Sequence, residues 1–110
     1  MKLQKEIKMT IEDAILRIAE LRAQLPSVKE EGRYGHRFGK VFINDGTVQR
    51  GLAPCPHCGR AVGMGLITVM HADGRMVGFK PRLHHYVQEG HPITNEDIDG
   101  ETLISILADA

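Results

Sequence analysis

The two cysteines of the chain are the residues whose type and spacing most clearly point to chemistry. They lie in the segment Pro54-Cys55-Pro56-His57-Cys58-Gly59. Two thiolates three positions apart in a tight turn can point at one centre, and the backbone N–H groups of such a turn can stabilise their charge. The glycine after the second cysteine allows the chain to reverse. The segment therefore predicts one half of a metal site.

This pattern resembles the knuckle of zinc-ribbon and zinc-finger proteins, which implies Zn²⁺ as the cofactor. One knuckle supplies two of the four ligands of a closed tetrahedral site, and the chain has no further cysteine. Histidines must supply the others, or the site stays open to water. Two histidines stand in an H-x5-H pair that fits the zinc-finger spacing. We predict four metal ligands: Cys55, Cys58, His85 and His91.

Two further histidines remain alternatives to His85. His84 lies nearer the face of the predicted helix that would meet the core, and His71 follows the knuckle at the C-x2-C-x12-H spacing of classical fingers. His57 lies between the cysteines, and we expect it to turn away from their metal.

A second resemblance extends the first. The segment Leu83-His84-His85-Tyr86-Val87-Gln88-Glu89-Gly90-His91-Pro92-Ile93-Thr94-Asn95-Glu96-Asp97-Ile98 is similar to the helix of Ros/MucR-type prokaryotic zinc fingers. The likeness puts His85 and His91 at ligand positions and Ile93-Thr94 at the start of a following helix. The stretch between the cysteines and the histidines is longer here than in that family, and so is the histidine spacing. The resemblance implies DNA binding in transcriptional control.

Two enzymatic interpretations are alternatives to a structural metal site. Cys-Pro-His-Cys is also the active-site tetrapeptide of DsbA-like thiol-disulfide oxidoreductases, where it starts a helix and lowers the pKa of the first thiol. Gly63 and Gly65 disfavour a helix after this motif. A catalytic zinc would need only three protein ligands and a water, with Glu89 as a candidate base. The sequence contains no other catalytic constellation, and a non-enzymatic role is the preferred interpretation.

The sequence predicts that the helices and strands that position these residues form one small α+β domain over residues 1–110. Thr10-Ile11-Glu12-Asp13 has the form of a capped helix start, apolar residues then recur near a 3.6-residue period, and Pro26 ends the run, so we predict a helix over about 10–25. Its apolar stripe packs on the domain or on a second copy. Residues 27–39 read as a loop.

Two β-hairpins, with Asp-Gly at each turn, are predicted over 41–49 and 66–79, one on each side of the zinc knuckle, and the zinc module spans about 51–93. Two short C-terminal helices follow, over 83–89 with a stop at Gly90 and over about 100–109 with Asp99 as its cap.

The zero net charge hides an asymmetry. Residues 33–88 carry eight basic and two acidic side chains, whereas residues 89–110 carry six acidic and no basic ones. A basic middle segment can contact phosphates, and basic residues interleaved with aromatic ones suit DNA or RNA. The candidate nucleic-acid contacts are Arg33, Arg37 and Lys40. Alternatively the acidic tail neutralises this segment, and the domain binds a protein partner or itself through the stripe of helix 10–25.

No apolar run approaches the ~20 residues that cross a bilayer. The segment Met1-Lys2-Leu3-Gln4-Lys5-Glu6 lacks the apolar stretch of a signal peptide. A cytoplasmic protein without a membrane partner is the expectation.

Overall fold

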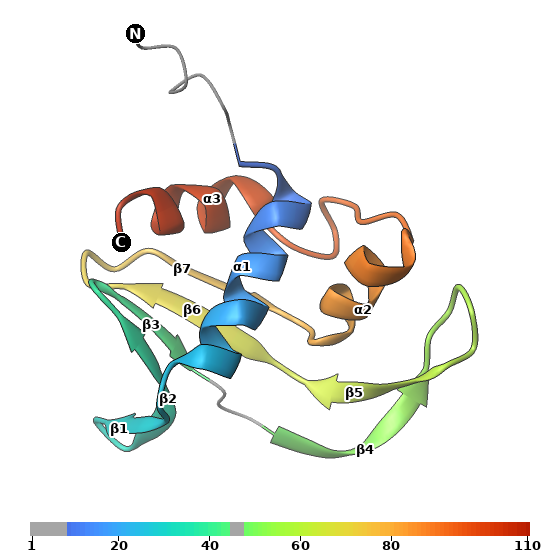
Figure 1. The fold of residues 1–110 in the computed structure, drawn as a ribbon, viewed down its shortest axis with the longest axis horizontal. Helices are drawn as coiled ribbons and strands as arrows, with labels where there is room; N and C mark the ends of the chain where they lie inside the picture. Colours follow the sequence, from blue (N-terminus) through green and yellow to red (C-terminus); the bar gives the residue numbers. More distant parts are fainter. Residues whose placement is uncertain (1–8, 45–47) are drawn as a thin grey trace, which may run out of the picture.

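The structure, a computed structural model, describes residues 9–44 and 48–110 and is of the α+β class that the sequence predicts (Figure 1). Three helices lie in the described residues: α1 (Ile11–Gln24), α2 (Arg82–Glu89) and α3 (Gly100–Ala108). The strands of the same ranges are β1 (Val28–Glu30), β2 (Arg33–Phe38), β3 (Val41–Asn44), β4 (Val48–Pro54), β5 (Ala61–Gly65), β6 (Ile67–His71) and β7 (Met76–Phe79).

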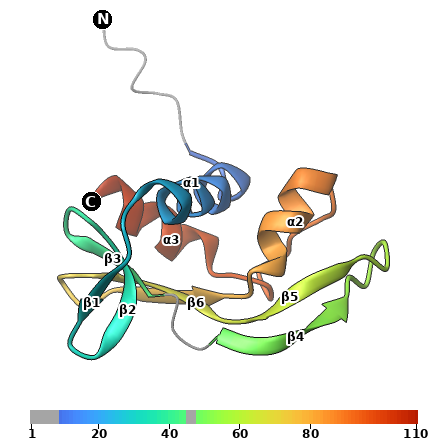
Figure 2. The same ribbon diagram turned by 60° about the horizontal axis from the view of Figure 1, so that its bottom comes forward.

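The strands form two antiparallel sheets. Five of them make the main sheet in the order β1-β2-β3-β6-β7, and β4 pairs with β5 in a separate two-stranded ribbon. Figure 2 shows the helices on one side of the strands, with α2 over the ribbon. The domain therefore has one layer of helices and one layer of strands, and the ribbon extends the strand layer.

Helix α1 confirms the predicted helix over 10–25. The Thr10 side chain accepts a hydrogen bond from the Asp13 N–H, and Asp13 accepts one from the Thr10 N–H, which completes a capping box. The stripe of Ala14, Ile15 and Ile18 is buried in the core. The face that the sequence offers to a second copy is thus covered by the domain itself.

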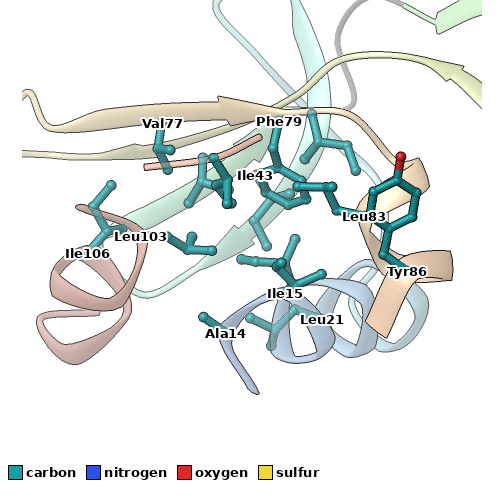
Figure 3. Close-up of a cluster of buried hydrophobic side chains, with 14 of the residues drawn as sticks. Ala14, Ile15, Leu21, Ile43, Val77, Phe79, Leu83, Tyr86, Leu103 and Ile106 are labelled. Carbon is teal, nitrogen blue, oxygen red and sulfur yellow. The ribbon is translucent and has the colours of Figure 1, made fainter. Parts of the chain in front are cut away.

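The core lies between the helices and the main sheet (Figure 3). Leu83 and Tyr86 of α2 are buried at one end of it, and Leu103 and Ile106 of α3 at the other. Aliphatic side chains from the inner face of the sheet complete it: Val41, Ile43, Ile67, Val69 and Val77. The whole chain has five aromatic residues, and this core is mostly aliphatic.

The hairpin predicted over 66–79 is confirmed as β6 and β7, with Met70 opposite Met76. The loop predicted over 27–39 is wrong, because β1 and β2 occupy it and pair with each other. Its glycines have different roles. Gly32 and Gly39 flank β2, whereas Gly35 lies within the strand, where an added Cβ would be 2.1 Å from the Ile43 carbonyl oxygen.

The hairpin predicted over 41–49 is also wrong in its pairing, and its turn residues 45–47 lie outside the described residues. Strand β3 pairs with β2 and β6, and β4 pairs with β5. Asn44 faces Thr68 and Val48 faces Gly65. The chain therefore does not reverse between β3 and β4, and together they form one arm of a long interrupted hairpin whose other arm is β5 and β6. The cysteine knuckle is its tip.

The C-terminal part follows the prediction except at one point. Helix α2 ends at Gly90, and the Asp99 side chain caps α3 by accepting from the Thr102 N–H. The helix start that the sequence suggests at Thr94 is instead an isolated turn, closed by a hydrogen bond from the Asp97 N–H to the Thr94 carbonyl.

The end of the acidic tail folds back on the basic segment. The carboxylate of Asp109 lies 2.8 Å from the Arg75 guanidinium, and its carbonyl accepts from His71 Nε2 at 2.9 Å. These bonds hold the end of α3 against the β6–β7 turn.

The structure leaves no room for a side chain at Gly35 of β2. We expect Gly35→Ala to lower the free energy of unfolding by about 1–3 kcal/mol, because the Cβ would collide with backbone of β3. Gly78→Ala, in the same sheet, meets only ordinary contacts with Leu66, and we expect it to be neutral or up to about 1 kcal/mol stabilising. Urea unfolding followed by circular dichroism compares them. Equal effects of the two substitutions would contradict the close approach at Gly35.

Candidate metal centre

The cysteine turn connects β4 to β5 and has a closed backbone geometry. The Cys55 N–H donates to the Arg60 carbonyl at 2.8 Å, and the Gly59 N–H donates to the Cys55 carbonyl at 2.8 Å. Gly59 has φ +77°, which L side chains rarely adopt. The glycine after the second cysteine therefore has the role the sequence predicts, since it lets the chain turn back into β5.

Helix α2 brings the histidines to this turn. Pro81 precedes its first residue, and Leu83 and Tyr86 fix its inner face in the core. At its end Gly90 is left-handed, with φ +77°, and the His91 N–H donates to the Tyr86 carbonyl at 2.9 Å. This reversal folds His91 back toward the helix that carries His85.

The four residues that the sequence selects lie together. One potential ligand atom from each of Cys55, Cys58, His85 and His91 falls within 4.8 Å of all the others. The Cys58 Sγ is 3.3 Å from the His85 Nε2. Ligands of a tetrahedral zinc ion, at bond lengths of about 2.0–2.3 Å, are separated by roughly 3.3–3.8 Å. The cluster is thus close to the size of a metal site, and it could hold a metal ion.

The alternatives to His85 are placed elsewhere. His84 is not one of the four clustered residues, although it neighbours His85. His71 has its Nε2 bonded to the Asp109 carbonyl, and its Nδ1 accepts from the Asp73 N–H at 3.1 Å. Both ring nitrogens of His71 are therefore engaged at the opposite end of the sheet.

The donor set is suited to a metal in a second respect. His91 Nε2 is buried and has no hydrogen-bond partner among the described residues. A buried imidazole nitrogen without a partner is unfavourable, because it has lost its contact with water. Coordination of the His91 ring would give this imidazole a partner inside the cluster.

The surroundings of Cys55 favour its thiolate. Burial of the thiol acts to raise its pKa, but hydrogen bonds from the N–H groups of His57 and Cys58, the Cys58 side chain and the positive charge of Arg82 outweigh this. The pKa of Cys55 therefore lies below its ordinary value. Deprotonated sulfur is the form that binds metal.

Three residues outside the predicted ligand set complete the surroundings. The His57 ring packs at 4.9 Å from both the Tyr86 ring and the His91 ring, and the Arg82 guanidinium lies 5.9 Å from the Tyr86 ring centre. His57 thus contacts a ligand from outside rather than joining the cluster. The packing of Tyr86 and Arg82 had no local signal in the sequence, since it depends on how α2 meets the knuckle.

Glu89 is the side chain that an enzymatic reading would use as a base. Its carboxylate lies 3.5 Å from the Arg60 guanidinium, in an exposed ion pair between α2 and the knuckle. The oxidoreductase reading needs a helix after Cys58, whereas here the strand β5 follows the turn. The motif is therefore a turn between two strands and does not begin a helix.

Comparison with known proteins gives no match, whether with family models, with curated proteins or with solved structures. Within 9–44 and 48–110, no helix is both long and apolar enough to cross a bilayer. The chemistry of the site is therefore inferred from the geometry of its residues alone.

The basic residues predicted to contact nucleic acid lie away from this cluster. Arg33 and Arg37 line one hollow of about 170 Å³ together with Glu30, and Lys40 lines a separate one of about 560 Å³. The Arg37 Nε donates to a Glu30 carboxylate oxygen at 3.1 Å, and this bond raises the pKa of Arg37. The structure thus neutralises Arg37 locally and does not gather all three cations in one hollow.

The two neighbouring histidines of α2 provide a matched test of the cluster. We expect His85→Ala to weaken Co²⁺ or Zn²⁺ binding by on the order of 100-fold or more, since four ligands share roughly 10–16 kcal/mol in structural zinc sites. His84→Ala should leave the affinity unchanged, because His84 is not in the cluster. Titration with Co²⁺, followed by its visible absorption, measures both. Equal loss in the two variants would contradict the assignment of His85.

Proposed function

We propose that this protein binds one Zn²⁺ ion through Cys55, Cys58, His85 and His91, and that the ion has a structural role. The observation that carries the proposal is the convergence of two sulfur and two imidazole donors from separate elements, the ribbon turn and the end of α2. Two thiolates and two neutral imidazoles form a donor set that zinc favours over hard cations such as Mg²⁺ or Ca²⁺.

Four protein ligands favour a structural site over a catalytic one. A catalytic zinc keeps one position for water or substrate, whereas four donors fill the tetrahedron. Cys55 is buried and both histidines are half-buried, whereas Cys58 is exposed, so an ion among them would be accessible mainly from the Cys58 side.

The proposed zinc supplies a link that the backbone lacks. The ribbon shares no ladder of hydrogen bonds with the main sheet in the described residues. Helix α2 is anchored in the core by Leu83 and Tyr86. Zinc would join the tip of the ribbon to this anchored helix, and its binding free energy would become folding free energy.

Metal analysis tests the structural role directly. We expect protein purified without added zinc to contain about one Zn²⁺ per chain by mass spectrometry, and Cys55→Ser to contain far less. Removal of the ion by a chelator should lower the melting temperature, since a ligand that binds only the folded state stabilises it. Val62→Ala, a core change in the same ribbon, should lower stability without loss of metal. Absence of zinc, or a melting temperature that chelation leaves unchanged, would overturn the proposal.

A nucleic-acid-binding role is a second proposal, supported by the basic excess over residues 33–88 and by the exposure of Arg33 and Lys40. Arg37 adds less to it, because its guanidinium is paired with Glu30. Arg33 begins β2 and Lys40 follows the end of that strand, so a nucleic acid that contacts both cations would lie along β2. The alternative is a zinc-stabilised module that binds a protein.

Salt dependence separates these two roles. For nucleic-acid binding, the fluorescence anisotropy of labelled DNA or RNA should rise with protein at low salt, and the affinity should fall steeply as salt is added. Arg33→Ala with Lys40→Ala should reduce the salt slope by about one to two phosphate contacts. Arg17→Ala, an exposed change on α1, is the control. No binding of either nucleic acid at low salt would exclude this role and leave the protein-binding module.

A further inference from the structure

The metal cluster contains both cysteines of the chain. Their sulfurs lie within 4.8 Å of each other, and neither is in a disulfide. Their environments differ, because Cys55 is only 2% exposed whereas Cys58 is an exposed residue. One sulfur is therefore open to small molecules from solvent, and the second is a buried sulfur within 4.8 Å of it.

We propose that the cluster is a redox-controlled zinc site, in which a hydroperoxide converts Cys55 and Cys58 to a disulfide and releases the ion. This inference rests on the proposed structural zinc. It concerns the regulation of the site, whereas the structural role concerns the reduced protein.

The reaction has two steps with hydrogen peroxide as oxidant. The Cys58 thiolate attacks one peroxide oxygen, so that an S–O bond forms, the O–O bond breaks and hydroxide leaves. The Cys55 thiolate then attacks Cys58 Sγ, so that the S–S bond forms and the S–O bond breaks. Two protons convert the two hydroxides to water. The two sulfurs lose two electrons to the peroxide, and Zn²⁺ leaves without a change of charge.

Because of where the four ligands lie in the chain, disulfide formation would release the zinc ion completely. Both sulfurs come from one turn, and both imidazoles come from α2 and the residue after its glycine. Disulfide formation removes every donor on the ribbon side, and two histidines alone do not make a closed zinc site. Because the chain has no other cysteine, Cys55–Cys58 is the one disulfide that can form within it.

The loss of zinc would remove a link between the tip of the ribbon and α2. The packing of the His57 ring on Tyr86 and the exposed ion pair between Arg60 and Glu89 then remain between the turn and the helix, and exposed ion pairs contribute little. Oxidised protein should therefore be cut faster by trypsin after Arg60 than reduced zinc-loaded protein.

The test treats zinc-loaded full-length protein with hydrogen peroxide in the presence of a chromogenic zinc chelator. We expect one zinc per chain to be released together with the loss of two hydrogens in the intact mass, and a thiol reductant should restore zinc binding. Oxidised methionine, such as exposed Met76, adds oxygen and is distinguished by mass. Zinc retained by the oxidant-treated chain, or released with sulfinic acid in place of the disulfide, would overturn the inference.

Cys58→His is the matched variant, since it keeps four metal ligands but cannot form the disulfide. If it binds zinc, we expect peroxide to release the ion several-fold more slowly than from the native chain, and equal rates would overturn the inference. If this variant does not fold or bind zinc, the mass of the native chain still decides. A native protein that carries no zinc would refute the structural site itself, whereas one that carries zinc and keeps it under peroxide refutes only its redox control.

Discussion

The position of one two-stranded ribbon is the constraint on which the site depends. Strands β4 and β5 continue from β3 and β6, yet in the described residues they form no hydrogen-bonded ladder with the five-stranded sheet (Figure 1). Their tip would be free to pivot if only the chain connections held it. Two buried side chains of the ribbon, Cys55 and Val62, pack with the core, and the knuckle meets α2. The contact between the turn and α2 therefore sets the geometry of the ligands.

Helix α2 and the knuckle support each other. A helix of eight residues is marginal alone, and this one has no side-chain cap at its N-terminus. It is held by Leu83 and Tyr86 in the core, by the left-handed Gly90 at its end, and by the ring of His57 packed on Tyr86. An ion among the four ligands would add the strongest of these links. The core thus holds this helix through Leu83 and Tyr86, and a bound ion would hold it through His85 and His91.

Local signals in the sequence predicted most elements but not all of their partners. The capping box at Thr10, the Asp-Gly hairpin at Asp73 and the stop at Gly90 are each encoded within a few residues, and each is confirmed. The strand β2 was missed because its glycines resembled those of a loop, and the partner of β3 was wrong because Asp45-Gly46 is a local signal while pairing with β6 is long-range. The H-x5-H spacing favoured His85 over His84, and the cluster confirms this choice through the rotation of α2, which Leu83 and Tyr86 fix in the core.

The distribution of the four ligands over two elements also determines how a metal link between those elements could be broken. If each element supplied one sulfur and one imidazole, loss of the thiolates would leave one ligand on either side, and a weakened link could persist. Here the ribbon supplies both sulfurs and the region of α2 supplies both imidazoles. A metal link of this kind would therefore depend on the oxidation state of the two sulfurs in one turn. Because the rest of the core packs through α1, α3 and the main sheet, loss of the link would alter the ribbon while the body of the domain keeps its own support.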